Sequence, residues 1–539
     1  MAKDFKIIKE FGGYRNKTDS TKLPPGTLIA GSQNVVLVDG ERVSVRGGYS
    51  LYGAANAALT PIISSVEFLT SRGLEIPIRS YDDELEFYYS AAWRRLQDGF
   101  TAVDFQFTTF YDTTENELTL LLVNGDSNMR MWSGGVTTFA SATAGPNTIT
   151  KQGATTWAAE GFLANGIPRS VIIDGTSYTY TGGEGTTTLT GVAPDPTVAG
   201  HAVGSVVHQA LRTTANTPAA GFNNDLISVL NGQVYVAAVN RSDVYVSNIN
   251  SYTNFAIPAP RIPGGATLFR LDGSVVGFVP QENVMYITAG TDFWYEVVFQ
   301  LSADIASEAV IIKRLKSGVR EAARTQDAIA RIKNNVVYIS NEPTLDTLGR
   351  LEQIDTPQSK PLSDPIKTDF DDYSFTNAHI KYWRNNIFIA LPSESLVLIY
   401  NVEQGFWEAP QILPIRRFAI IGGLLYGHSN GVPETYQLFT GTSDGIVGGL
   451  SGNPIDARAV FSFMSFDQRG YSKKFDEWFS EGYISSNTTL TLQLRYDFTS
   501  LIRNYSILGS DADIIFNQPA DGSLGKLSLG KSSLAGGGD

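Results

Sequence analysis

The sequence predicts an all-β fold: a β-propeller of about seven blades with an inserted small β domain and additional N- and C-terminal β elements. Three observations predict it: a repeat built only of strands, frequent turn residues, and many aromatic residues. The chain has 52 Gly and 23 Pro, and aromatic residues make up 11% of it. Gly and Pro mark turns, whereas Tyr and Phe suit half-buried strands. A β-sandwich or jelly roll with accidental regularity is the alternative.

The repeat is a polar turn pair followed by three strand residues, the last of them often Tyr. The last positions of the five strong copies are spaced by 51, 52, 51 and 37 residues. Repeats of about 40–50 residues made of strands are typical of propeller blades, which bury their faces against neighbouring blades. Two weaker copies lie upstream, at Asp83–Phe87 and Glu115–Leu120. The strong copies are Asn231–Tyr235, Glu282–Tyr286, Asn334–Tyr338, Asn385–Ile389 and Gly422–Tyr426.

Most strong copies continue into a second aromatic strand. Its aromatic residue follows the first strand by 9 to 11 positions, as for Tyr245 after Tyr235. Two strands of about five residues joined by a tight turn need this spacing. Each copy is therefore predicted to contain a β-hairpin. The other aromatic residues in this position are Tyr295, Tyr400 and Tyr436.

The length of 539 residues predicts about three domains, although large all-β units often remain in one piece. Asp39-Gly40, between two alternating apolar runs, predicts a hairpin near the N-terminus. Ser170–Tyr180 predicts another within a Thr- and Gly-rich interruption of the repeat. The predicted parts are an N-terminal arm and hairpin platform (1–58), propeller blades (59–139 and 216–450), an inserted small β domain (140–215), a C-terminal β unit (451–522) and a Gly/Ser-rich tail (523–539).

Two segments are predicted to contain helix. One is 302–332, which is rich in Ala and charged residues. The other is 361–373, where Ser363 is a candidate N-cap for a short helix that begins at Asp364-Pro365.

Charge and composition exclude several classes of function. The net charge is −13 and no long basic run occurs, which argues against a protein that grips nucleic acid by its phosphates. An acidic protein can still line a channel through which DNA slides without adhering. The chain has no Cys, so disulfides and thiolate metal sites are excluded. No apolar run is long enough to span a membrane, and the charged first ten residues do not resemble a signal peptide.

Motifs that suggest catalysis or metal binding lack the surroundings that this chemistry needs. The P-loop pattern at Gly525–Ser532 and the two G-x-S-x-G patterns at 427–431 and 441–445 each need a strand before them and a helix after them. The acidic clusters at 82–86 and 369–372 are expected to be solvated turns. We therefore predict no enzyme, no cofactor and no metal site. The four histidines, which lack the spacing of a zinc site, are His201, His208, His379 and His428.

Several motifs occur in the order found in the tail-nozzle proteins of short-tailed bacteriophages, also called tail tubular protein B or packaged-DNA stabilisation proteins. The N-terminal segment holds Gly12-Gly13, Leu23-Pro24, Asn34 and Arg46-Gly47-Gly48-Tyr49, although the family more often has Arg-Pro-Gly at the last site. Together these motifs resemble that family over most of the chain. The later motifs are Arg384–Pro392, Val397–Asn401, Gly405–Trp407 and Lys473–Ser485.

The resemblance implies a virion structural protein of the phage tail, made in the host bacterial cytoplasm. It implies a homo-oligomer, a hexameric ring below the portal and its adaptor, with tail fibre or spike proteins as neighbours. Packaged DNA would pass through the lumen without sequence-specific binding. No catalytic residues come with this family. Candidate adaptor or ring contacts are Arg15, Arg42 and Arg46, for which exposed hairpin charges are the plainer interpretation.

Two other functions stay open at this point. One is a glycan- or receptor-binding propeller at a tail tip or baseplate, in which exposed Trp and Tyr would stack on sugars. The other is a propeller glycosidase that uses paired carboxylates.

Overall fold

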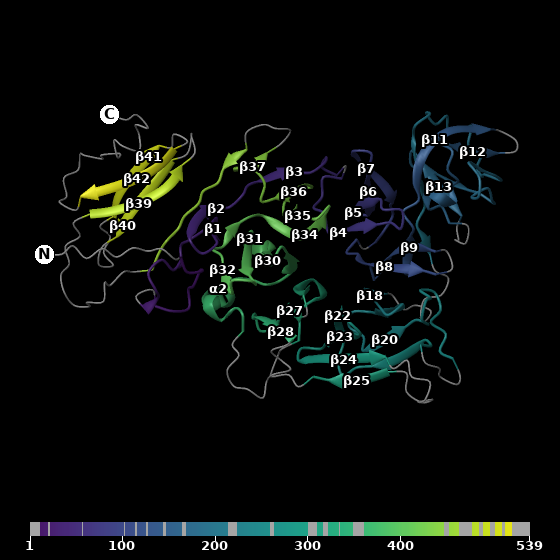
Figure 1. Cartoon of the computed structure of the whole chain (residues 1–539). Coiled ribbons are helices and arrows are strands. Elements are labelled where there is room, and N and C mark those ends of the chain that lie inside the picture. The colour runs from purple at the N-terminus through teal and green to yellow at the C-terminus, as the bar shows by residue number, and fades with distance from the viewer. Residues whose placement is uncertain are drawn as a thin grey trace. The chain divides into compact units, whose positions relative to one another are not determined.

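A computed structural model of the chain divides into two compact units, Met1–Met464 and Ser465–Asp539. The first unit consists almost entirely of antiparallel sheets (Figure 1). The structure describes residues 11–519 except for gaps at 20–21, 57, 102, 114–115, 126–127, 144–146, 164–168, 214–223, 259–263, 300–309, 316–321, 334, 349–360, 447–451, 463–476, 485–488, 496–501 and 509–511.

Seven sheets in the first unit form the blades of a propeller, and the first four follow the expected hairpin pattern. Within each of these blades, strands that follow one another in the chain pair antiparallel. In blade 2 the inserted domain separates β10 from its partner β17. Blade 1 is β4 (Ser64–Leu69), β5 (Glu75–Tyr81), β6 (Glu84–Tyr89) and β7 (Ala92–Gln97); blade 2 is β8 (Gln106–Asp112), β9 (Glu117–Val123), β10 (Arg130–Trp132) and β17 (Arg212–Thr213); blade 3 is β18 (Leu226–Leu230), β19 (Gln233–Ala237), β20 (Asp243–Val246) and β21 (Thr267–Arg270); blade 4 is β22 (Val275–Gln281), β23 (Val284–Ala289), β24 (Phe293–Phe299) and β25 (Val310–Arg314).

The last three blades complete the ring. Blade 7 takes its fourth strand from the N-terminal segment, because β3 (Tyr49–Leu51) pairs antiparallel with β36. Blade 5 is β26 (Ile329–Ile332), β27 (Asn335–Ile339) and β28 (Leu345–Thr347); blade 6 is β29 (His379–Trp383), β30 (Asn386–Leu391), β31 (Leu396–Asn401), β32 (Phe406–Trp407) and β33 (Gln411–Ile412); blade 7 is β34 (Ile415–Ile421), β35 (Leu424–Ser429), β36 (Thr435–Leu438), β3, β37 (Ser443–Ile446) and β38 (Asn453–Pro454).

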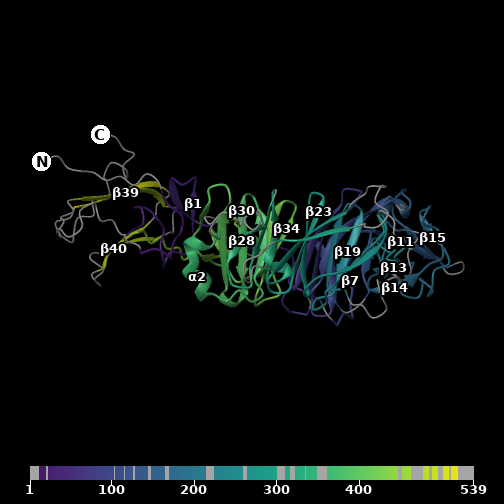
Figure 2. The same cartoon turned by 90° about the horizontal axis from the view of Figure 1, so that it is seen from below.

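The blades close into a ring through their first strands. Each first strand contacts that of the next blade, in the order β4, β8, β18, β22, β26, β29 and β34, and β34 contacts β4 again. The blades follow the same order in Figure 1, and Figure 2 shows them edge-on. The predicted propeller and its count of seven blades are therefore confirmed. All seven predicted repeat copies fall on the second strands, β6, β9, β19, β23, β27, β30 and β35.

The turns explain why the repeat begins with Asn, Gly or another polar residue. In blade 3, Asn231 and Gly232 link the first two strands with φ values of 50° and 72°. Positive φ at both turn residues is what a tight hairpin requires, and Asn and Gly tolerate it best. The strand that follows is fully buried, so it is uniformly apolar apart from its first residue, Gln233.

The inserted domain is a six-stranded sheet between β10 and β17 of blade 2. It has its own core, in which Trp157, Phe162 and Tyr178 are buried. Its β13–β14 hairpin, which the sequence predicts, turns at Asp174 and Gly175, both with positive φ. Its strands are β11 (Val136–Thr143), β12 (Thr148–Lys151), β13 (Ser170–Ile173), β14 (Thr176–Thr179), β15 (Thr188–Leu189) and β16 (Val206–Gln209).

The two helix predictions had different outcomes. The short helix is confirmed, since η4 (Asp364–Ile366) leads into α2 (Lys367–Asp372). Ser363 does not cap it with its side chain; its Oγ instead accepts the backbone N–H of Leu345 at 3.1 Å. The prediction for 302–332 is wrong for most of the part that the structure describes, because β25 pairs with β24 and β26 pairs with β27 there. The short 3₁₀ helix η3 (Gln326–Ala328) precedes β26.

Two shorter groups of strands complete the described structure. The N-terminal hairpin is β1 (Val35–Val38) and β2 (Arg42–Val45), and the second unit has two antiparallel pairs, β39 with β42 and β40 with β41. The predicted tail at 523–539 lies outside the described residues. The strands of the second unit are β39 (Glu477–Ile484), β40 (Thr489–Arg495), β41 (Ile502–Leu508) and β42 (Ala512–Pro519).

Candidate functional site

The N-terminal segment builds a platform on the outside of blades 6 and 7. We define the platform as residues 11–58 together with 452–462, which bridge back to it through Gln33↔Arg458 and Leu28↔Phe461. The β1–β2 turn at Asp39-Gly40 has positive φ at both residues, as a type I′ hairpin requires. Alternate residues of β1 are buried in one core with Trp407 of blade 6.

Arg46 lies at the centre of the platform. It is only 3% exposed and forms a bidentate ion pair with Asp444, with both N–O distances 2.7 Å. Its Nε donates to Oδ1 of Asn34 at 3.1 Å. It also donates to the carbonyls of Gly47 and Ile412. Arg46 therefore ties the N-terminal hairpin to the last blade. The sequence analysis had named it as a candidate adaptor or ring contact, but its guanidinium is buried and already bound within the chain.

Asn34 has a backbone conformation that explains why Asn heads this strand. Its φ is 54°, in the left-handed region that Asn tolerates better than most residues. Its Oδ1 accepts the N–H of Ile412 at 2.7 Å, and its Nδ2 donates to the carbonyl of Asp456 at 2.7 Å. The side chain thus joins three parts of the chain that are far apart in sequence.

The two glycines after Arg46 leave no room for side chains. A Cβ on Gly48 would lie 1.9 Å from the carbonyl oxygen of Ser443, and one on Gly47 would lie 2.7 Å from the backbone of Phe439. These close approaches let β3 fit between β36 and β37. Gly47, where the resembled family more often has Pro, is therefore explained by the tight backbone crossing.

The other two predicted contact residues lie on the surface. Arg15 and Arg42 are exposed, and neither forms an ion pair with another described residue. They stay available for a partner, and the expected adaptor or ring contact stays a prediction for both.

Two buried carboxyl groups fasten the platform to the propeller. Glu408 accepts the backbone N–H of Leu37 at 2.8 Å, and burial raises its pKa to about 8. Burial also raises the pKa of Asp369 to about 6, although hydrogen bonds from Tyr14 and Asn16 lower it. Both groups thus favour the protonated state more strongly in the folded protein than in the unfolded chain.

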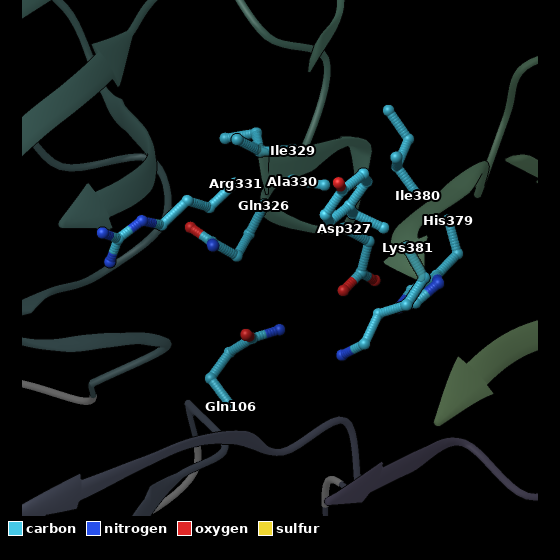
Figure 3. A pocket seen from close by; sticks show the side chains of 10 residues that line it. Gln106, Gln326, Asp327, Ile329, Ala330, Arg331, His379, Ile380 and Lys381 are labelled. Atoms are coloured by element: carbon cyan, nitrogen blue, oxygen red, sulfur yellow. The ribbon is translucent and has the colours of Figure 1, made fainter. Parts of the chain in front are cut away.

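A cavity of about 360 Å³ lies at the axis of the propeller. Its lining comes from the first strands of blades 2, 5 and 6, which stand on different sides of the ring, and from the turn before blade 5. Figure 3 shows Gln106 on one side of this axial pocket, with Asp327 and Lys381 on the other. The remaining lining residues are Gln326, Ile329, Ala330, Arg331, His379, Ile380 and Tyr382.

An ion-pair network across the ring of blades includes Asp327, which lines the axial pocket. Arg417 of β34 binds Asp104 through two hydrogen bonds of 2.7 and 3.1 Å, and it also binds Asp327. These residues belong to blade 7, the entry to blade 2 and the entry to blade 5, so the network joins three sides of the ring. Burial lowers the pKa of His379 far below its usual range, and nearby Arg417 and Lys381 lower it further.

The axial pocket was not predicted from the sequence. Lys381 and Arg331 each stand a few residues before a repeat turn, in the first strand of a blade. Both residues line the axial pocket in this fold, but the repeat alone does not single them out, because side chains alternate between the two faces of a strand. Identifying the cross-ring partners would have required the fold, because Arg417 and Asp104 are 313 residues apart.

The motifs set aside in the sequence analysis lie where no catalytic constellation is seen among the described residues. Residues 427–431 run from β35 into a turn, and 443–446 form β37, so neither G-x-S-x-G pattern precedes a helix. Asp82 and Asp83 are exposed turn residues, whereas Glu86 is buried against Arg79. The P-loop pattern at 525–532 lies outside the described residues.

Two searches of the described part of the chain are negative. No three His, Asp or Glu side chains there are grouped so that they hold a metal ion. None of its helices has the length and apolar character needed to cross a membrane.

The comparisons with known proteins give structural neighbours but no family. No protein-family model and no curated protein matches the chain. The computationally designed Ika8 protein is similar, with 10% identity, 73% of this chain and 99% of that chain covered, and a TM-score of 0.37. BamB from Moraxella catarrhalis has 10% identity, 80% and 98% coverage and a TM-score of 0.33. Hsv2 from Kluyveromyces lactis has 11% identity, 65% and 97% coverage and a TM-score of 0.22.

These three structures are β-propellers, the class that the ring of seven sheets defines for this chain. At these identities and TM-scores they carry no argument about function. The resemblance to phage nozzle proteins therefore rests on the sequence motifs.

Proposed function

We propose that the chain is a virion structural protein of a short-tailed bacteriophage, a subunit of the tail nozzle below the portal and its adaptor. The observation that carries the proposal is the order of motifs from Gly12 to Ser485, which resembles that family over most of the chain. The proposal includes a hexameric ring, with tail fibres or spikes as neighbours, in the virion tail.

The positions of the motifs support treating them as one set. The later motifs at Arg384–Pro392 and Gly405–Trp407 lie in blade 6, the blade on which the platform packs. The N–H of Tyr14, next to Gly12-Gly13, donates to the carbonyl of Trp407 at 2.7 Å. A Cβ on Gly13 would lie 2.4 Å from that of Phe406. Motifs separated by nearly 400 residues therefore contact one another, which a chance collection of hairpins would not require.

The path of DNA in this proposal runs between subunits. The propeller's own axis is narrowed to a cavity of about 360 Å³ and crossed by the network of Arg417, Asp104 and Asp327. We therefore propose that the lumen is enclosed by the ring of copies. A net charge of −13 suits a wall along which DNA slides, because the chain offers few cations to hold phosphates.

The described tryptophans with placed side chains give the glycan-binding alternative no specific support. Of the tryptophans in the described ranges, four are buried in the fold: Trp132, Trp157, Trp294 and Trp407. Trp93 and Trp383 are partly exposed, but the guanidinium groups of Arg79 and Arg384 cover a face of each. A sugar would need such faces to be open.

Electron microscopy of the purified full chain, alone and mixed with the neighbouring virion proteins, tests the proposal. A six-fold ring that joins the adaptor is the expected result. A monomer or trimer that never joins such a ring would overturn it. A glycan array run on the same preparation serves as the second arm, because saturable sugar binding without ring formation would establish the alternative.

A further inference from the structure

We propose that the axial pocket of the propeller is a binding site for a small oxyanion, a phosphate or carboxylate group held between Lys381 and Gln106, with Arg331 farther along the lining. The cavity volume of about 360 Å³ falls within the usual range for ligand pockets, about 300–1,000 Å³. This inference does not depend on the nozzle proposal, because it concerns one chain.

The charged groups around the axial pocket carry a net positive charge. The acidic groups of the cross-ring network, Asp327 and Asp104, are both bound by Arg417. Lys381 and Arg331 line the cavity, and neither forms an ion pair with another described residue. Together these three cations and two carboxylates leave one net positive charge around the pocket, in a chain whose net charge is −13.

Two glutamines contribute uncharged polar groups to the pocket. The amide of Gln326 is already used, because its Oε1 accepts the N–H of Phe278 at 2.7 Å and its Nε2 donates to the carbonyl of the same residue. Gln106 has no such bond within the described structure and faces the cavity from the opposite side (Figure 3). Its amide therefore supplies a donor across from Lys381.

The protonation state of His379 follows from its surroundings. The backbone N–H of Phe418 donates to its Nδ1 at 3.4 Å, which leaves the ring proton on Nε2. Burial and the neighbouring cations keep its pKa low, so the ring is neutral and acts as a donor in the pocket lining. His379 thus adds no charge to the lining.

The charge of Lys381 is costly at the axis. Burial lowers the pKa of Lys381, because the charged ammonium loses water at this position, although Asp327 raises it. An anion next to Nζ would offset that cost and satisfy the ammonium donors. A neutral or cationic ligand would not.

Calorimetric titration of the full chain with inorganic phosphate at neutral pH tests the proposal. Sulfate forms a second arm, and chloride at equal ionic strength separates a site for an oxyanion from general screening. Acetate forms a third arm, which shows whether a single carboxylate is sufficient. Saturable heat with phosphate or sulfate but not with chloride is the expected result.

The variants locate the binding. Lys381→Met keeps the length of the side chain and removes the charge, and we expect it to weaken binding by roughly tenfold or more. Lys22→Met, at an exposed platform lysine, is the matched control and should bind as the unchanged protein does. If Lys381→Met fails to fold, Gln106→Leu, at a partly exposed position, carries the same test.

Two results would overturn the inference. One is the absence of saturable heat with every oxyanion. The other is an unchanged isotherm in the pocket variants, which would place any bound anion elsewhere on the chain.

Discussion

The platform and the axial pocket both hold charged groups away from solvent, but they treat them differently. In the platform, Arg46 meets Asp444, Asn34 and two carbonyls, so its charge is compensated within the chain. In the pocket, Lys381 lies near Asp327, whose carboxylate is already bound by Arg417. Arg46 therefore stabilises the fold, whereas Lys381 is the group that we propose to bind a ligand.

The largest effect is expected from removing the compensated charge. Arg46→Met should lower the free energy of unfolding by about 3–5 kcal/mol, because Asp444 and Asn34 would lose a buried partner. Urea unfolding of the full chain measures this. Arg42→Met, on the exposed side of the same hairpin, should change it by less than about 0.5 kcal/mol. Equal losses of unfolding free energy in the two variants would show that the buried contacts of Arg46 do not hold the N-terminal hairpin on the last blade.

An intermediate, pH-dependent effect is expected at Glu408. Its folded pKa of about 8 lies above the unfolded value of about 4.3, so its protonated form stabilises the fold and this contribution is lost as the pH rises between those values. Glu408→Gln cannot ionise, and its amide oxygen can still accept the N–H of Leu37. We therefore expect it to match the unchanged protein near pH 4 and to exceed its stability by roughly 2–4 kcal/mol at pH 9.

Thermal or urea unfolding across this pH range measures the difference. Glu41→Gln, an exposed carboxylate on the platform, is the control and should show little change at any pH. A Glu408→Gln difference that is constant with pH would mean that packing at this site, and not ionisation, determines the effect.

The blades were predictable from sequence because their signals are local. Asn231-Gly232 must occupy positive φ, and Tyr235 must follow a few residues later in a strand, so turn and strand are visible within six positions. The same local logic gives the hairpins at Asp39-Gly40 and Asp174-Gly175.

The closure of the propeller ring could not be predicted from local sequence signals. β3 joins β36 across nearly 400 residues, and no local pattern distinguishes that strand from an ordinary hairpin end. The segment around β25 was mistaken for a helix because the region is rich in Ala and charged residues, which favour helices. Pairing with β24 overrides that propensity.

The three arginines predicted as contacts cannot be told apart from sequence. Arg46 looked like an exposed hairpin charge, since its partner Asp444 lies 398 residues away. Arg15 and Arg42 carry the same sequence signal and are exposed. Only the fold separates them.

The smallest effect on stability, and the most informative one for function, is expected from Arg15→Gln combined with Arg42→Gln. Both side chains are exposed and unpaired among the described residues, so the unfolding free energy should change by less than about 0.5 kcal/mol. If they contact the adaptor or the next subunit, ring assembly or adaptor binding should weaken by roughly tenfold, and more so at low salt, where exposed charges are less screened.

The control is Arg384→Gln, which removes an exposed cation from blade 6 outside the platform. Sedimentation or electron microscopy of the assembled ring measures the effect, with each variant compared at two salt concentrations. A double variant that assembles and binds the adaptor as the control does would remove these arginines from the interface. The subunits of the proposed hexamer would then have to contact one another through other surfaces, since Arg46 is already bound to Asp444 inside the chain.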